Sequence, residues 1–189
     1  MVIDEEFKIE CWNRALLTLG TSYVFSKRAT KYKRLIRLIT VLGIIVPLLL
    51  GGVAATYGSN SSVLIWALII AGPISIAQLV LSGVSLVYKW DDLLAYSLES
   101  QTDNRQLSDS YQTLAKFPPA DLNDLDSQFS VLKAKEEARN NQDDKVSFSD
   151  KENRLGMRYG LFIFKRKCEG CKEQPISMIP TKCGICGNF

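Results

Sequence analysis

Hydrophobic residues gather in one stretch of the chain, from Leu38 to Tyr88, which contains no Asp, Glu, Lys or Arg. A polar patch of turn-forming residues at 57–62 divides this stretch into two apolar runs, 35–56 and 63–88. A helix needs about 20 apolar residues to cross the hydrocarbon core of a bilayer, and each run is long enough. The pattern predicts a transmembrane hairpin of two helices over residues 35–88.

The segments that flank the hairpin show the spacing of amphipathic helices. In 1–34, apolar residues recur at intervals of three and four, which predicts an N-terminal helix. Residues 89–140 predict further helix, with a break expected at 102–104 and a stop at the Pro118-Pro119 pair. A seam with heptad-like spacing then consists of Leu122, Leu125, Phe129 and Leu132. It is too short for a free coiled coil and favours packing on the preceding helix or on the N-terminal helix.

Both predicted spans carry a face of small or polar residues. In the first span this face consists of Thr40, Gly43, Pro47 and Gly51, and in the second span of Ala67, Ala71, Ser75, Gln78, Ser82 and Ser85. Two interpretations stay open for the second face. Small residues and hydroxyls allow close helix–helix packing. Alternatively, Ser75, Gln78, Ser82 and Ser85 line an aqueous path in an oligomer.

The amino-acid composition changes twice after residue 140. Residues 141–157 are polar and mixed in charge, which predicts a linker. Residues 158–167 are aromatic and β-branched, which predicts a short strand at the start of a C-terminal tail, 158–189.

The tail contains a pair of CxxC units formed by Cys168, Cys171, Cys183 and Cys186. Four thiolates at this spacing suit a tetrahedral Zn²⁺ ion, and such a site has no open position for a substrate. We expect three glycines to relieve crowding in the two turns, namely Gly170, Gly184 and Gly187. An iron–sulfur cluster uses the same ligands, and a redox role is a further alternative. The predicted fold class is a mainly α membrane protein: a transmembrane hairpin with flanking cytoplasmic helices and a small zinc-ribbon-like tail.

Charge and composition predict the orientation of the chain in the membrane and exclude several kinds of catalytic and metal-binding site. Six basic residues precede the first span without an intervening acid, namely Lys27, Arg28, Lys31, Lys33, Arg34 and Arg37, whereas the patch at 57–62 is uncharged. By the positive-inside rule both termini are cytoplasmic. The chain has no histidine, which removes Ser-His and Cys-His catalysis and His-containing metal sites. No other nucleophile–base pair or phosphate-binding loop is visible, so we expect no enzymatic activity.

Two parts of the chain resemble known families. Over residues 5–117 the order of helix, basic run, hairpin and a helix opening with Lys89-Trp90-Asp91-Asp92 resembles the SLATT group, bacterial two-transmembrane effector domains of antiphage systems. The tail is similar to that of small bacterial mobile-element proteins marked by the same cysteine spacing. The resemblance implies an effector in the bacterial inner membrane that is held quiet until a signal releases it.

The sequence therefore favours one function and leaves another open. The first is an antiphage membrane effector that forms a homo-oligomer in the lipid and permeabilises or depolarises the inner membrane. A neighbour-encoded signalling enzyme, such as a nucleotide cyclase or a reverse transcriptase, is a possible partner. The alternative is a membrane-anchored adaptor whose zinc ribbon recruits a cytosolic protein or nucleic acid.

Overall fold

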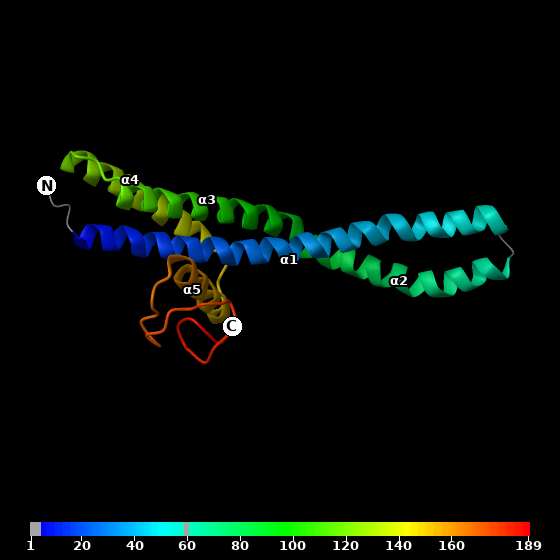
Figure 1. The fold of residues 1–189 in the computed structure, drawn as a ribbon. Coiled ribbons are helices and arrows are strands. Elements are labelled where there is room, and N and C mark those ends of the chain that lie inside the picture. The colour runs from blue at the N-terminus through cyan, green and yellow to red at the C-terminus, as the bar shows by residue number, and fades with distance from the viewer. Residues whose placement is uncertain (1–4, 59–60) are drawn as a thin grey trace. The chain divides into compact units, whose positions relative to one another are not determined.

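A computed structural model describes residues 5–58 and 61–189 of the chain, and within them the regular structure is entirely helical. The helices are α1 (Glu5–Tyr57), α2 (Ser62–Val87), α3 (Trp90–Lys116), α4 (Leu122–Asp143) and α5 (Asp150–Phe164) (Figure 1). They fall into two compact units. The hairpin unit contains 28–96, and the helical unit contains 1–27 and 97–189.

The first helix is longer than predicted. The expected N-terminal helix and the first expected span are one continuous helix, α1, which passes through Pro47 without ending. Nothing at the boundary between residues 34 and 35 stops a helix, because that region holds no proline, glycine or capping residue.

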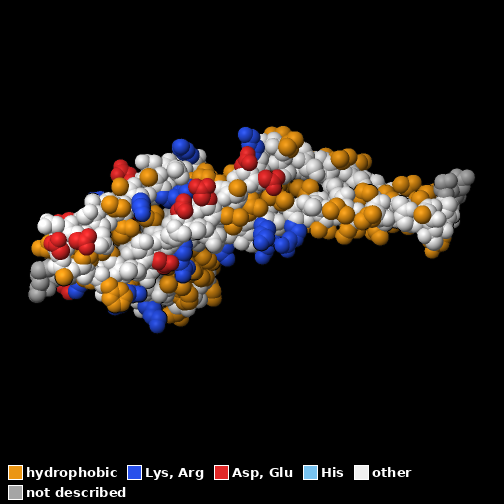
Figure 2. All heavy atoms as spheres, turned by 90° about the horizontal axis from the view of Figure 1, so that it is seen from above, with side chains coloured by type: hydrophobic (Ala, Val, Ile, Leu, Met, Phe, Trp, Pro, Cys, Tyr) orange, Lys and Arg blue, Asp and Glu red, His pale blue; other side chains and the backbone are white. Residues whose placement is uncertain are grey.

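In the hairpin unit, α2 begins at a capped end. The side chain of Ser61 accepts a hydrogen bond from the backbone N–H of Leu64, and Gly58 turns the chain with a φ of 78°. By length and composition, α1 and α2 can each cross a membrane, and the most apolar 18-residue window of each contains no buried residue. In Figure 2, hydrophobic side chains are spread among uncharged atoms over the visible face of α2 and of the second half of α1.

In the helical unit, α3 and α4 pack against the first part of α1. Their shared core contains Cys11 and Ala15 of α1, Tyr111 and Leu114 of α3, and Leu125 of α4. Cys11 is fully buried there, and burial raises the pKa of its thiol to about 11. The packing partners of α4 therefore include both helices that the sequence left as alternatives.

Most of the predicted seam of α4 faces this core. Phe129 and Leu132 pack against it beside the buried Leu125, whereas Leu122 stays 55 % exposed. The helix α3 ends at Lys116, before the Pro118-Pro119 pair, as predicted.

The predicted break at 102–104 is wrong, because α3 runs through it. The side chain of Asn104 is buried and donates hydrogen bonds to the carboxylate of Asp143 and to the backbone carbonyl of Ser100. The Thr102 hydroxyl donates to the carbonyl of Leu98. Tertiary and local partners therefore satisfy polar side chains that in isolation favour a turn.

The strand predicted for 158–167 and the linker predicted for 141–157 are also wrong. Helix α4 continues to Asp143, and α5 covers the second part of the predicted linker and most of the predicted strand. Ser149 and Glu152 form a capping box, in which each side chain binds the backbone N–H of the other residue. This Ser-x-x-Glu signal marks a helix start and was available in the sequence. Beyond α5, Lys165 adopts left-handed backbone angles and ends the helix.

Glycines let α5 cross α1 at very short range. A Cβ atom on Gly20 would lie 2.6 Å from the carbonyl oxygen of Gly156, and one on Gly160 would lie 2.7 Å from that of Leu16. Next to this crossing, the rings of Tyr23 and Tyr159 stack with their centroids 3.8 Å apart. The close approach explains why helix-breaking residues stand inside both helices.

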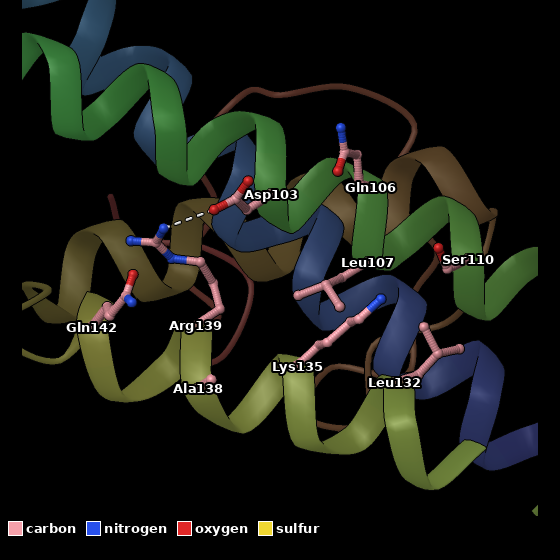
Figure 3. Close-up of a pocket in the computed structure, with 9 residues that line it drawn as sticks. All are labelled: Asp103, Gln106, Leu107, Ser110, Leu132, Lys135, Ala138, Arg139 and Gln142. Carbon is pink, nitrogen blue, oxygen red and sulfur yellow. Dashed lines mark hydrogen bonds and ion pairs between the residues drawn. The ribbon is translucent and has the colours of Figure 1, made fainter. Parts of the chain in front are cut away.

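Ion pairs and a hydrogen bond join α4 to α1 and α3. Glu136 accepts hydrogen bonds from Arg14 and from the Tyr111 hydroxyl, each at 2.7 Å. Arg139 binds Asp103 at 2.8 Å and Asp143 at 2.9 Å. Figure 3 shows Arg139 turned toward Asp103 beside a cavity of about 410 Å³ between α3 and α4. Because its guanidinium is already paired with carboxylates, this arginine offers no free cation to an anionic ligand in the cavity.

Candidate metal centre and hairpin stripe

The four cysteines of the tail converge on one point. Their Sγ atoms all lie within 4.8 Å of one another, with Cys168 and Cys183 3.9 Å apart and Cys171 and Cys186 3.8 Å apart. A tetrahedral ion with metal–sulfur bonds of about 2.3 Å places its sulfurs about 3.8 Å apart. A disulfide needs about 2.05 Å, and all four thiols are free. The donor set therefore fits a metal ion.

The backbone forms the same turn after each CxxC unit. The N–H of Lys172 donates to the carbonyl of Cys168 at 2.8 Å, and the N–H of Gly187 donates to that of Cys183 at 3.0 Å. Lys172 supplies the left-handed backbone angles, with a φ of 60°, directly after the first unit. These turns aim the two sulfurs of each unit toward the same point.

Two of the three glycines expected to relieve crowding in these turns do stand at crowded positions. A Cβ atom on Gly170 would lie 2.8 Å from the Ile185 side chain, and one on Gly187 would overlap the Thr181 carbonyl oxygen. The expectation for Gly184 is wrong, because nothing lies within 4 Å of the position its Cβ would take.

The cysteine cluster lies against the helices and does not extend freely from them. Cys168 and Cys186 are buried in a hydrophobic cluster with Leu16 of α1 and Leu161 of α5. The other two cysteines are partly exposed. Arg166 fixes the start of the tail by donating to the Asn13 side chain at 2.5 Å. The centre is thus half-embedded in the helical unit, whereas the sequence predicted a separate tail.

A buried arginine of α5 reaches into the tail. The Nε of Arg158 donates to the carbonyl of Ser177 at 2.8 Å, and its Nη1 donates to the carbonyl of Cys186 at 3.3 Å. It therefore holds both the loop between the CxxC units and the second unit itself. Sequence reasoning missed this residue because it placed residue 158 in a strand.

The surroundings of Cys183 and Cys186 shift the pKa values of these two thiols in opposite directions. Backbone N–H groups of Cys186 and Ile185 lower the pKa of Cys183 to about 6. Burial, together with the neighbouring thiols, raises the pKa of Cys186. A bound cation favours the thiolate form of every ligand, so an ion supplies the charge that Cys186 needs to ionise.

In the hairpin unit, the polar stripe of α2 lies on the helix face that is turned toward α1. Its residues are all partly buried, namely Ala67, Ala71, Ser75, Gln78, Ser82 and Ser85, whereas most of the Leu, Ile and Val residues of α2 are exposed. The amide of Gln78 lies over Gly43, where an added Cβ would be 2.6 Å from its Nε2.

The small-residue face expected on the first span does not meet this stripe as a whole. Gly43 is partly buried, but Thr40, Pro47 and Gly51 are exposed, and nothing lies within 4 Å of a Cβ on Gly51. The α1 residues turned inward instead are larger and include Leu42, Val46 and Leu50. At 100° per residue the four members fall within about 80° of one another and share a face, but this face lies to one side of the inward one and meets α2 only at Gly43.

The polar side chains of the α2 stripe have no hydrogen-bond partner among the residues that the structure describes. Among the described residues, the side chains of Ser75, Gln78, Ser82 and Ser85 form no hydrogen bond, whereas Thr40 and Thr56 of α1 donate to carbonyls of their own helix. The hairpin thus brings the predicted stripe onto one face but does not satisfy it.

These features define a class: an all-helical protein with two helices able to cross a membrane and a C-terminal four-cysteine site of the metal-binding kind. The chain belongs to the Mobilome CxxCx(11)CxxC protein family, whose profile matches residues 8–189. The predicted resemblance of the tail is thereby confirmed. Neither curated proteins nor solved structures give a significant match. The comparisons do not show the resemblance to the SLATT group, which stays a prediction.

Proposed function

We propose that this protein is a membrane effector carried by bacterial mobile elements and used in antiphage defence. In this proposal α1 and α2 insert into the inner membrane, both termini lie in the cytoplasm, and several copies assemble to permeabilise or depolarise the membrane. Membership of a mobile-element family and the two apolar helices support the setting. A neighbour-encoded signalling enzyme supplies the trigger.

The observation that carries the proposal is the unsatisfied stripe Ser75, Gln78, Ser82 and Ser85. Water is absent from the bilayer core, so a polar group without a protein partner there costs several kcal/mol. The hairpin leaves these groups without hydrogen bonds inside the described part of one chain. Water in a path lined by several copies satisfies them.

Such a path needs several copies of the chain. A single hairpin encloses no water, and in one chain the stripe is turned toward α1. Conduction therefore requires α2 to exchange its contact with α1 for contacts with other copies. A trigger produces this exchange when the two arrangements differ by only a few kcal/mol.

The second part of the proposal concerns the tail. Cys168, Cys171, Cys183 and Cys186 hold one Zn²⁺, which has a structural role because protein sulfurs fill its four positions. Zinc bound by four thiolates contributes on the order of 10 kcal/mol to ordering a small domain. The ion keeps the tail folded against α1 and α5, and we assign no catalysis to it.

The test of the effector proposal is membrane potential in cells that express Gln78→Leu. We expect this variant to insert normally but not to depolarise cells, because leucine removes the amide that binds water along the path. Gln78→Asn is the matched control: it keeps the amide and should keep activity. If Gln78→Leu and Ser82→Leu both depolarise cells like the parent protein, the stripe does not line a path.

A second candidate function is the membrane-anchored adaptor, and the loop between the CxxC units favours it. Ile176 is 86 % and Ile179 is 69 % exposed, and Lys172 and Lys182 flank this loop. Exposed isoleucines beside cations suit the docking of a cytosolic protein or nucleic acid. An adaptor depends on Ile176 and Ile179 and tolerates Gln78→Leu, so the two functions predict opposite results for the same pair of variants.

A further inference from the structure

Two arginines in the helical unit are equally buried but have different partners. Arg139 and Arg158 are each 5 % exposed. Arg139 forms ion pairs with Glu99, Asp103 and Asp143. Arg158 donates to the carbonyls of Ser177 and Cys186 and, among the residues that the structure describes, forms no ion pair.

Burial of the Arg158 charge without an ion pair costs free energy unless a negative charge lies near it. Carbonyl oxygens satisfy its hydrogen-bonding capacity but leave a buried positive charge without compensation. The centre beside it supplies that charge, because one divalent ion and four thiolates together carry a net charge of about −2. The lysines of the tail are less suited, since Lys165, Lys167, Lys172 and Lys182 are exposed to water.

We propose that Arg158 is the buried counter-charge of the metal–thiolate centre and positions its second CxxC unit. The inference rests on the proposed metal site and adds a residue outside the cysteine motif that determines metal affinity. With metal bound, the guanidinium faces a dianionic centre. Without metal, the four cysteines are not all ionised, so the cluster carries less negative charge than the loaded centre and compensates the same guanidinium less. Arg158 therefore stabilises the loaded tail selectively.

The test compares variants of the purified full chain in detergent. Zinc affinity is measured by competition with a chromophoric chelator for Arg158→Lys, Arg158→Gln and the parent. Loss of a group that supports metal ligands typically weakens metal binding roughly 10- to 100-fold, and we expect this loss for Arg158→Gln. Arg158→Lys keeps the charge and should remain within a few-fold of the parent. Arg166→Gln is the matched control, because the Arg166 side chain donates to Asn13 and, among the described residues, forms no hydrogen bond with the CxxC units.

A second measurement separates charge compensation from a merely structural role. In Arg158→Met the chain of carbons remains but the charge and donors are removed. We expect the thermal stability of this variant to fall in zinc-loaded protein and to stay equal or rise after zinc is removed by a chelator under reducing conditions. A structural arginine would lower stability in both states.

The outcomes are distinguishable. If the parent binds no stoichiometric metal, the proposed metal site fails and this inference fails with it. If the parent binds one zinc ion and Arg158→Gln binds it equally tightly, only the role of Arg158 is overturned. Equal losses for the lysine and glutamine variants also overturn the counter-charge, since they show that the charge is irrelevant.

Discussion

Substitution of Gly160 tests the contact through which α5 and the cysteine centre dock on α1. A Cβ atom at this position would lie 2.7 Å from the Leu16 carbonyl oxygen and 2.9 Å from the Leu16 side chain, where ordinary contacts begin at 3.4 Å. The nearer atom belongs to the backbone, so α5 must move. Overpacking of this kind costs about 1–3 kcal/mol. Alanine recovers up to about 1 kcal/mol from its better helix propensity.

We therefore expect Gly160→Ala to lower the free energy of unfolding by about 1 kcal/mol and Gly160→Val to lower it by about 2 kcal/mol or more. The assay uses Trp12 as the sole tryptophan, with the other two replaced by phenylalanine. Trp12 contacts the Phe164 ring of α5 at a centroid distance of 5.7 Å, so its fluorescence reports the docking of α5.

Gly184→Ala is the control, because nothing lies within 4 Å of the added methyl group. Helix propensity alone predicts the opposite result, a more stable protein for Gly160→Ala. A stabilised Gly160→Ala variant, with Trp12 still packed against Phe164, would refute the close crossing of α1 and α5.

Two further predictions concern topology and thiol chemistry. If both termini are cytoplasmic, an impermeant maleimide should label Ser61→Cys in intact cells and leave the tail cysteines unlabelled; the reverse pattern would contradict the orientation. In metal-free, reduced protein at pH 7, substoichiometric iodoacetamide should modify Cys183 before Cys186. The pKa of Cys183 is lowered to about 6, so this thiol is mostly thiolate at pH 7. The rate at which iodoacetamide modifies Cys183 should fall as the pH drops below about 6. Modification of Cys186 first would show that the two environments are misassigned.

The hairpin and the cysteine site were readable from sequence because each depends on a local rule. The absence of charge from Leu38 to Tyr88 marks both apolar helices without reference to any other part of the chain. Likewise, CxxC spacing brings two sulfurs together whatever surrounds them.

The errors arose where tertiary contacts override local composition. The aromatic and β-branched residues at 158–167 suggest a strand, yet most of them belong to helix α5. Gly156 and Gly160 allow this helix to pack closely against α1. Asn104 sits inside α3 because Asp143, far along the chain, accepts its hydrogen bond. The role of Arg158 depends on the same helix, so it stayed hidden until α5 was known. Of these signals, only the capping box at Ser149 was visible locally.

The central claim is that the hairpin conducts ions through an oligomer lined by the α2 stripe. Ion leakage from liposomes that contain only the purified protein tests it most directly, since no other cellular component contributes. A high protein-to-lipid ratio favours assembly by mass action without the signalling enzyme. Under this condition we predict leakage with the parent protein, its loss with Gln78→Leu, and its retention with Gln78→Asn at equal amounts of inserted protein. Liposomes that stay intact despite verified insertion and assembly of the parent protein, or that leak equally with Gln78→Leu, would contradict the claim.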